Sequence, residues 1–502
     1  MYSPDRRDFL SASAAAGGLA FLGNLPPVRA ADARPDPDLV RLDSGIEPLV
    51  RMLEDTPRDK LLEEVGGRVK KGLAYRDVLA ALLLAGVRNI RPRPNVGFKF
   101  HAVLVVNSAH QAAMAGPDNE RWLPLFWALD NFKSSQAQNI QESGWRMKPV
   151  DEAKVPPTRK ARAAFVAAMD DWDVEAADVA VAGLVRSAEA GELFDLFARY
   201  GARDFRDIGH KIIYVGNAFR TLEVIGWQHA EPVLRSLAFA ILKHDGKNPA
   251  KEDLEPDRPG RRNAERLKNA DVPPRLADGS KPELAEELVK LLRAESADSL
   301  GERAANSLAN GVTPRHVWDG LFLGAGELLM RQPGIVALHS LTTLNAMHYA
   351  YRTTGDDGLR RFLLLQSASF VPMFREAMKS RGKVEDFGIE SLETPDDSSR
   401  PKDAGEIFAT LSKNKLSAAQ KAMILLKANP AAARELTDEA RRLIFLKGRD
   451  SHDYKFSSAV LEDAALVSPA VRDRFLAASL FWLKGTGDAD SGLVKRTRAA
   501  LA

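Results

Sequence analysis

The sequence predicts an all-α protein. In nearly every apolar segment, apolar residues recur at the i, i+3, i+4 and i+7 spacing of an amphipathic helix, and alanine and leucine predominate over β-branched residues. No convincing run alternates apolar and polar residues as a half-buried strand does. The chain has 502 residues, of which 45% are hydrophobic, so it can bury a large core. At ordinary helix lengths we expect about fifteen or more helices.

Nine segments show the helical pattern most clearly. In chain order they are 77–87, 172–187, 209–225, 231–243, 282–293, 334–352, 358–379, 418–427 and 457–466. Neighbouring pairs such as 173–187 with 190–200, and 206–225 with 229–243, predict stacked antiparallel helix hairpins. No fixed repeat period is present. We therefore expect residues 31–502 to form a single large multi-helical body.

Two long segments interrupt this pattern. Residues 245–281 and 381–404 are charged and rich in proline, which is typical of exposed connections. The composition is similar on both sides of each segment. We therefore interpret them as charged surface insertions in one helical body rather than as linkers between domains.

The N-terminus resembles a twin-arginine (Tat) export signal. Arg6 and Arg7 are followed by Phe9, a weakly apolar stretch rich in alanine and glycine, and small residues up to Ala30. The apolar stretch is shorter than the ~20 residues that span a bilayer, so we expect no stable membrane span. The interpretation is a signal peptide at 1–30, with the Tat translocase as partner and a periplasmic or secreted product.

Charge and cysteine content exclude several classes of function. Lys and Arg number 71 against 68 Asp and Glu, and this balance argues against a nucleic-acid binder. The absence of cysteine excludes disulfides, thiolate metal sites and a cysteine nucleophile. No phosphate-binding glycine loop or GxSxG elbow occurs. Any bound metal must therefore be held by histidine, carboxylate or backbone oxygen.

The nine histidines are the most conspicuous candidate ligands. Eight of them lie in or beside apolar segments: His101, His110, His210, His229, His316, His339, His348 and His452. Other polar residues share helix faces with some of them. The clearest stripes are His210, Tyr214, Asn217 and Thr221, and Asn345, His348 and Arg352. Burying such groups costs about 1–3 kcal/mol each unless they find partners, so these stripes favour a common polar interior.

Spacing limits how these histidines can bind a metal. His101 and His110 are nine residues apart, as are His339 and His348, and nine residues turn a helix by 900°. The members of each pair therefore face opposite sides of one helix. No His-x3-His motif occurs. A metal site must consequently take one histidine from each of several helices.

Three segments resemble the questin oxidase-like family. They are FHAVLVVNSAHQAAMAG at 100–116, GHKIIYVGNAFRTLEVIG at 209–226 and HSLTTLNAMHYAYR at 339–352. His210, Ile213 and Gly216 keep a His-x2-Ile-x2-Gly spacing of that family. Lys211 stands where the family often has proline, and Tyr214 where it has a second histidine.

The resemblance implies an all-helical oxidoreductase for residues 31–502. Its chemistry would be Baeyer–Villiger-like oxygen insertion or ring cleavage on polycyclic aromatics. The histidines that it places in the site are His101, His110, His210, His339 and His348. The family's activity is associated with NADPH, which an exported enzyme could not obtain. Bound metal with oxygen, or an external electron acceptor, is therefore expected instead.

The leading hypothesis is an exported metal-dependent oxidoreductase acting on a small aromatic or other organic substrate. The expected metal is iron or copper, and its expected ligands are His101, His110, His210, His339 and His348. The expected catalytic groups are His210, Tyr214 and His452. Asn217 and Arg352 are expected to orient the cofactor or the substrate. His452, flanked by Asp453, could be a carboxylate-oriented base. Two alternatives remain open: a non-enzymatic helical scaffold that binds a partner, and a hydrolase or lyase on an α/α framework.

Overall fold

The computed structural model describes residues 38–92, 99–269, 282–393 and 400–502. Within these ranges the chain forms 22 α-helices, six short 3₁₀ helices and no strand, which confirms the all-α prediction. The predicted signal peptide at 1–30 lies outside the described residues. Among the described helices, none is both long enough and apolar enough to cross a bilayer.

The helices follow one another through short connections. The first group is α2 (Glu47–Asp55), α3 (Arg58–Lys70), α4 (Tyr75–Asn89), α5 (His101–Ala115), α6 (Trp122–Glu142), α7 (Thr158–Asp171), α8 (Val174–Val185) and α9 (Ala190–Gly201). The second is α10 (His210–Ile225), α11 (Ala230–Ile241), α12 (Arg258–Asn269), α13 (Pro282–Ala294), α14 (Ala297–Ala309), α15 (Pro314–Arg331) and α16 (Ile335–Thr353). The last is α17 (Asp357–Met378), α18 (Ala404–Leu411), α19 (Lys415–Ala428), α20 (Ala432–Lys447), α21 (Ser451–Asp463), α22 (Pro469–Ser479) and α23 (Gly492–Leu501).

All nine segments with clear helical periodicity are helices, and one begins earlier than expected. Helix α21 begins at Ser451, six residues before the start of the periodic segment 457–466. A capping box explains the early start: the Asp450 carboxylate accepts from the backbone N–H of Asp453, and the Asp453 carboxylate accepts from that of Asp450. The polar run before residue 457 therefore forms the first turns of a buried helix.

The two charged segments, which were expected to be surface insertions, include parts that pack against the helical body. Helix α12 lies within 245–281 and packs against α14 and α17. Its fully buried Asn263 donates to Gln366 and Ser369. In the segment 381–404, Ile389 and Leu392 are buried. Helix α12 packs through a polar side chain, which hydropathy does not recognise. Residues 270–281 and 394–399 lie outside the described ranges.

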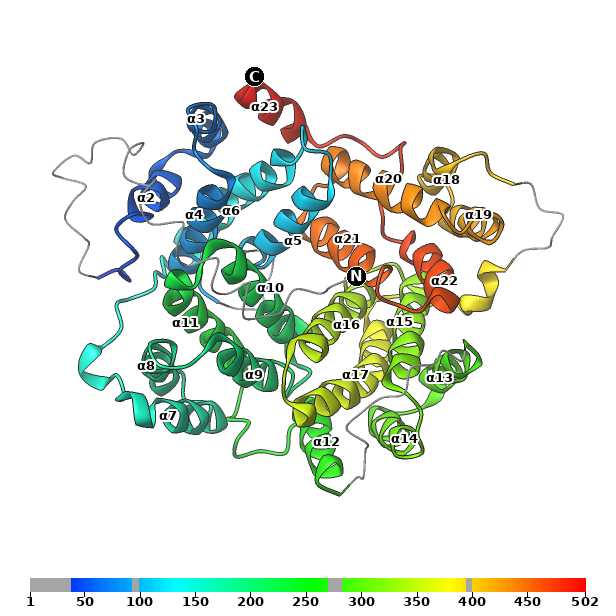
Figure 1. The fold of residues 1–502 in the computed structure, drawn as a ribbon, viewed down its shortest axis with the longest axis horizontal. Helices are drawn as coiled ribbons and strands as arrows, with labels where there is room; N and C mark the ends of the chain where they lie inside the picture. The colour runs from blue at the N-terminus through cyan, green and yellow to red at the C-terminus, as the bar shows by residue number, and fades with distance from the viewer. Residues whose placement is uncertain (1–37, 93–98, 270–281, 394–399) are drawn as a thin grey trace, which may run out of the picture.

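Four helices form a closed ring near the middle of the molecule. Helix α5 contacts α10 and α21, and α16 contacts the same two helices from the other side. Figure 1 shows α5, α10, α16 and α21 surrounded by the remaining helices. Each of the four carries a histidine in its first or second turn: His101, His210, His339 and His452. The fold therefore brings the N-terminal ends of four helices, each with one imidazole, to one place.

A buried ion cluster fixes the N-terminal helices. Arg88 of α4 is 1% exposed and forms paired hydrogen bonds of 2.7 Å to Glu54 and of 2.8 Å to Glu47, both on α2. Removing one partner of a buried ion pair leaves an uncompensated charge in the interior.

We expect Arg88→Met to lower the free energy of unfolding by about 3–5 kcal/mol, because Glu54 would remain buried without its cation. Chemical denaturation followed by circular dichroism measures this loss. The matched control is Arg434→Met, since Arg434 is 90% exposed and its pair with Asp438 lies at 3.7 Å. That change should cost less than about 1 kcal/mol. Equal losses in the two variants would contradict the assignment.

Candidate metal centre

Four buried histidines meet inside the helical ring. The Nε2 atom of His210 lies 3.0 Å from Nε2 of His101 and 3.1 Å from Nε2 of His339. One ring nitrogen from each of His101, His339 and His452 lies within 4.8 Å of the other two. The His452 ring centroid is 4.7 Å from that of His101 and 5.2 Å from that of His339. Three of these histidines are thus close enough to bind one metal ion, and His210 adjoins two of them.

Backbone carbonyls set the tautomers of two rings. His210 Nδ1 lies 2.6 Å from the carbonyl oxygen of Asp207, and His339 Nδ1 lies 2.6 Å from that of Ile335. A carbonyl oxygen only accepts hydrogen bonds, so Nδ1 of each ring carries a proton. In the neutral rings, Nε2 of His210 and Nε2 of His339 then carry no proton, and each has a lone pair. Two lone pairs face each other at 3.1 Å and form no hydrogen bond.

Protonation of one of these two rings would relieve the contact between the lone pairs, but it is unfavourable. Burial holds the pKa of His210 and of His339 well below the usual range of histidine, and the nearby Lys455 acts in the same direction. A metal cation, by contrast, binds neutral imidazole through this lone pair. Ligands about 2.1 Å from a metal are roughly 3.0 Å apart at right angles and about 3.4 Å apart in a tetrahedron. The observed Nε2 separations of 3.0 and 3.1 Å match ligands at right angles.

Three of the four rings also have the outer partners that metal ligands require. Histidines that bind metals donate their other ring N–H to a carbonyl or carboxylate, which fixes the ring orientation. The carbonyls of Asp207 and Ile335 do this for His210 and His339. The Asp450 carboxylate lies 3.4 Å from Nδ1 of His452. The donor set therefore fits a metal ion bound by neutral imidazoles.

A strained turn delivers the carbonyl of Asp207. Asp207 (φ 58°), Ile208 (φ 47°) and Gly209 (φ 81°) are three consecutive residues in the left-handed region. Each non-glycine residue in this region costs about 1–3 kcal/mol, and the cost is greatest for a β-branched residue. Such strain persists only where the surroundings enforce it. Here it directs a backbone carbonyl onto His210 Nδ1 at 2.6 Å.

Buried contacts on both sides hold this turn. The fully buried pair Asp204 and Lys211 is joined at 2.9 Å, and it brackets the turn from before and after. Gly209 packs so closely on α16 that an added Cβ would overlap the hydroxyl and methyl of Thr343. The turn is therefore clamped between an ion pair and the helix that carries His339.

The electrostatics around the cluster are positive. The ligand group found among the described residues consists of histidines alone, without a carboxylate. Four helix N-termini point at it, each with a partial positive charge. Lys455 of α21 is fully buried, its Nζ has no hydrogen-bond partner in the described structure, and burial lowers its pKa to about 7. This setting favours neutral imidazole ligands and an anionic exogenous ligand.

A small cavity continues from the histidines along the ring. It measures about 20 Å³, enough for one water or a diatomic molecule. The residues seven positions after the four histidines all line it: Ser108, Asn217, Ala346 and Ala459. Lys455, three positions after His452, lines it too. Because the same offset reaches one cavity from every helix, the four helices run in the same direction.

A second, wider cavity lies further along. It measures about 300 Å³ and is lined mainly by apolar residues of α5, α20 and α21, with Arg352 and Arg441 beside them. Gln111 lines both cavities. Arg220 of the inner wall donates to both carboxylate oxygens of Glu462 in the outer wall, at 3.0 and 2.9 Å. The inner cavity and the pocket of small-molecule size therefore adjoin at Gln111 and at this ion pair.

The other predicted site residues lie at various distances from this centre. His110 points away from the cluster, and its Nδ1 lies 3.4 Å from the Tyr75 hydroxyl. His348 packs among aromatic rings of α15, and its Nδ1 lies 3.9 Å from the Asp463 carboxylate. Their positions agree with the half-turn expected from the nine-residue spacing. Tyr214 donates to Ser236 of α11 and so points out of the ring.

Asn217 and Arg352 line the inner and the outer cavity, respectively. The Asn217 amide donates to the carbonyl of Leu104 at 2.8 Å. Asp453, expected to orient His452, is instead bound in the capping box and to Lys484 at 2.8 Å. Asp450 faces the His452 ring in its place.

Sequence reasoning missed Lys455 and the strained turn. His452, Lys455, Ala459 and Glu462 recur at i, i+3, i+7 and i+10, the same kind of polar stripe that marks α10 and α16. That pattern could have assigned them to the interior. Nothing in the sequence before Gly209 indicates two left-handed non-glycine residues, because their conformation depends on contacts with α16.

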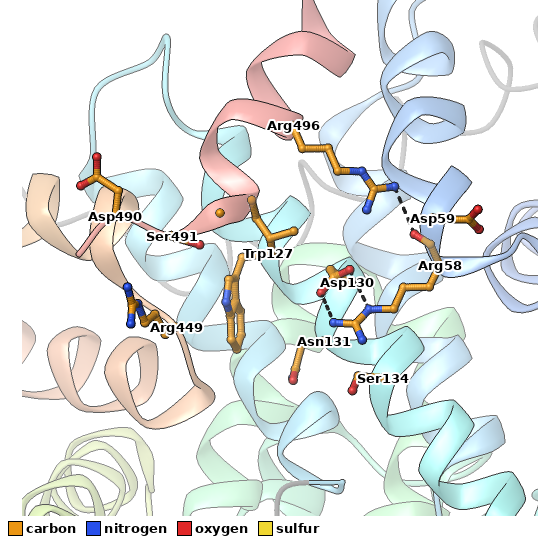
Figure 2. A pocket seen from close by; sticks show the side chains of 12 residues that line it. Arg58, Asp59, Trp127, Asp130, Asn131, Ser134, Arg449, Asp490, Ser491 and Arg496 are labelled. Carbon is orange, nitrogen blue, oxygen red and sulfur yellow. Dashed lines mark hydrogen bonds and ion pairs between the residues drawn. The ribbon is translucent and has the colours of Figure 1, made fainter. Parts of the chain in front are cut away.

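A larger groove is lined by residues of α3, α6 and α23 and by Arg449, which precedes α21 (Figure 2). It measures about 830 Å³, and its walls include Arg449 and the ion pair between Arg58 and Asp130. Trp127 lines it and packs against Tyr454, with ring centroids 4.6 Å apart and ring planes tilted by 33°. Tyr454 is two residues from His452 and therefore faces away from the cluster. None of the four histidines lines this groove.

We expect Gly209→Ala to lower the free energy of unfolding by about 2–5 kcal/mol, the sum of left-handed strain and overlap with Thr343. Gly246→Ala is the matched control, because Gly246 has φ +79° but no neighbouring atom within 4 Å of an added Cβ. It should cost about 1–2 kcal/mol from backbone strain alone. Thermal and chemical denaturation measure both. The same loss in both variants would rule out the clamp on α16.

His348 should make stability depend on pH. Burial lowers the pKa of His348 to about 4, against an ordinary value of 6.5. As pH falls from 6.5 toward 4, the unfolded chain takes up a proton that the folded protein does not bind. Stability is lost across this window, by up to about 3 kcal/mol. Burial raises the pKa of the adjacent Asp463, which has the opposite dependence.

The measurement therefore compares wild type with His348→Phe, a ring that suits the surrounding aromatic side chains. The variant should lose less stability between pH 6.5 and 4. A parallel pH dependence in both proteins would contradict the assignment of the low pKa.

Comparisons with known proteins do not assign the chain. No protein-family model, no curated protein and no solved structure matches it. The fold and the four-histidine cluster are therefore described from the structure of this chain alone.

Proposed function

We propose that the protein is an exported, metal-dependent oxidoreductase that acts on a small organic substrate. Iron or copper would be held by His101, His210, His339 and His452. The observation that carries the proposal is the pair of Nε2 lone pairs of His210 and His339, which face each other at 3.1 Å. A metal ion satisfies both, whereas a proton is disfavoured by burial.

The donor set supports a redox metal. Imidazole suits iron, copper, nickel and zinc, whereas magnesium, calcium and manganese prefer oxygen ligands. Bound iron or copper would supply one-electron chemistry and a binding position for dioxygen. The resemblance of three histidine-bearing segments to the questin oxidase-like family supports oxidation of an aromatic substrate. The twin-arginine resemblance at 1–30 supports export through the Tat translocase to the periplasm or beyond, where NADPH is absent.

The residues of the chain have distinct parts in this proposal. The carbonyls of Asp207 and Ile335 keep the Nε2 atoms of His210 and His339 free for the metal. Burial of all four rings excludes bulk water. The Nζ of Lys455 can donate or accept a proton in the inner cavity, since its pKa is lowered to about 7. Asn217 lines the same cavity.

Metal content tests the proposal. Full-length protein, expressed with its export system and purified without chelators, should contain about one iron or copper per chain. His339→Ala should reduce that content at least tenfold, because it removes a central ligand. Elemental analysis by plasma mass spectrometry measures both. Electron paramagnetic resonance of the copper(II)-loaded protein should show nitrogen coupling that His339→Ala weakens.

His110→Ala is the matched control, because His110 contacts Tyr75 outside the cluster. It should leave the metal content unchanged. Stoichiometric zinc in place of iron and copper would contradict an oxidoreductase and favour a hydrolase. Metal content that is equally low in wild type and His339→Ala would remove the metalloenzyme altogether.

A further inference from the structure

The Arg220–Glu462 ion pair joins the walls of the two cavities that lie along the histidine-bearing helices. Arg220 lines the inner cavity and Glu462 the outer one. One guanidinium nitrogen of Arg220, Nη2, donates to both carboxylate oxygens of Glu462, at 3.0 and 2.9 Å. The inner cavity of about 20 Å³ is too small for an organic molecule, whereas the outer one of about 300 Å³ is of ligand size. For an organic molecule to pass from the outer cavity into the inner one, this pair would have to separate.

We propose that Arg220 and Glu462 form a substrate gate, and that the substrate is an apolar molecule carrying one oxyanion, a carboxylate or a phenolate. The anion takes the place of Glu462 on Arg220 as the substrate enters. This inference rests on the proposed function, because the histidine cluster gives the gate its purpose.

The lining of the outer cavity defines this chemistry. Ile444, Phe445 and Leu461 supply apolar surface, and Arg352 and Arg441 supply positive charge at its edge. A molecule with an apolar body and one negative group complements both features. A planar guanidinium binds carboxylate and similar oxyanions with two parallel hydrogen bonds.

Arg220 is built to exchange partners. Its guanidinium lies 4.0 Å from the ring centroid of Tyr349, and this cation–π contact remains when Glu462 leaves. The side chain of Arg220 is 11% exposed and that of Glu462 is 32% exposed, so the carboxylate is the partner nearer to solvent. Its movement outward would also break the 2.8 Å hydrogen bond that Glu462 accepts from the Asn345 amide. In this exchange the Arg220 guanidinium therefore stays in the wall of the inner cavity, and Glu462 is the partner that leaves.

Positive groups continue inward from the gate. Arg352 lies in the outer cavity, Arg220 at the gate and Lys455 in the inner cavity, where its Nζ has no hydrogen-bond partner in the described structure. Beyond them are the N-termini of the four helices. An anion therefore meets a favourable donor at each step toward the histidines.

Two fluorescent probes with the same rings test the gate: 1-anilinonaphthalene-8-sulfonate, which is anionic, and N-phenyl-1-naphthylamine, which is uncharged. Each is titrated into the full-length protein. Glu462→Gln should tighten binding of the anionic probe about fivefold or more, because it frees Arg220. Arg220→Met should weaken it about tenfold. Neither change should move the affinity for the uncharged probe more than about twofold.

Two further variants control the result. Arg220→Lys keeps the charge but loses the paired hydrogen bonds, so the anionic probe should bind with intermediate affinity. Arg449→Gln removes an exposed arginine from the separate groove of Figure 2 and should change nothing. Melting temperatures within a few degrees of wild type establish that each variant is folded. If Glu462→Gln or Arg220→Met does not fold, the test depends on Arg220→Lys. Unchanged affinity of Arg220→Lys for the anionic probe would then overturn the gate.

Equal effects on both probes, or no tightening in Glu462→Gln, would overturn the gate. A change in Arg449→Gln would move the anion site to the other groove and would overturn it too. Probe binding does not require metal, so the titrations are made on metal-stripped and metal-containing protein. A gate effect in a protein that contains no metal as purified would support the gate and contradict the proposed function. Metal in the purified protein without a gate effect would support the proposed function and overturn the gate.

Discussion

Two backbone carbonyls determine what the centre of this protein can bind. The oxygens of Asp207 and Ile335 each accept a hydrogen bond from Nδ1–H of a buried histidine, so the Nε2 lone pairs of His210 and His339 face each other at 3.1 Å. The rest of the site serves this contact. The left-handed turn before His210 positions one carbonyl, and the packing of Gly209 on α16 keeps the turn in place.

The direction of the helices matters as much as the histidines. Helices α5, α10, α16 and α21 run the same way, with their N-termini at the cluster. Their combined dipoles disfavour imidazolium and favour anions, so a metal cation at the cluster would need an anionic ligand beside it. Because the four helices are aligned, the residues seven positions after the histidines line the inner cavity. Arg220 and Glu462, ten positions after His210 and His452, lie next along the helices and form the ion pair. Fold and chemistry are therefore linked through one shared face on four helices.

Much of the fold was predictable, because periodic apolar segments such as 209–225 and 334–352 determine their own helices. The opposite orientations of His101 and His110 follow from helix geometry and are observed. The partnership of His452 with the other three was not predictable, because it depends on the capping box that starts α21 early and on the packing of α21 between α5 and α16. The burial of α12 was hidden by its polar sequence, since its deepest side chain is Asn263.

The central claim is that the four imidazoles bind one metal ion through nitrogen. X-ray absorption at the metal edge of the purified protein tests it most directly. The account predicts at least three, and at most four, imidazole nitrogens at about 2.0–2.1 Å. The second-shell carbons of imidazole rings should give the matching outer scattering. A spectrum dominated by oxygen ligands without imidazole scattering would contradict a histidine-bound metal centre.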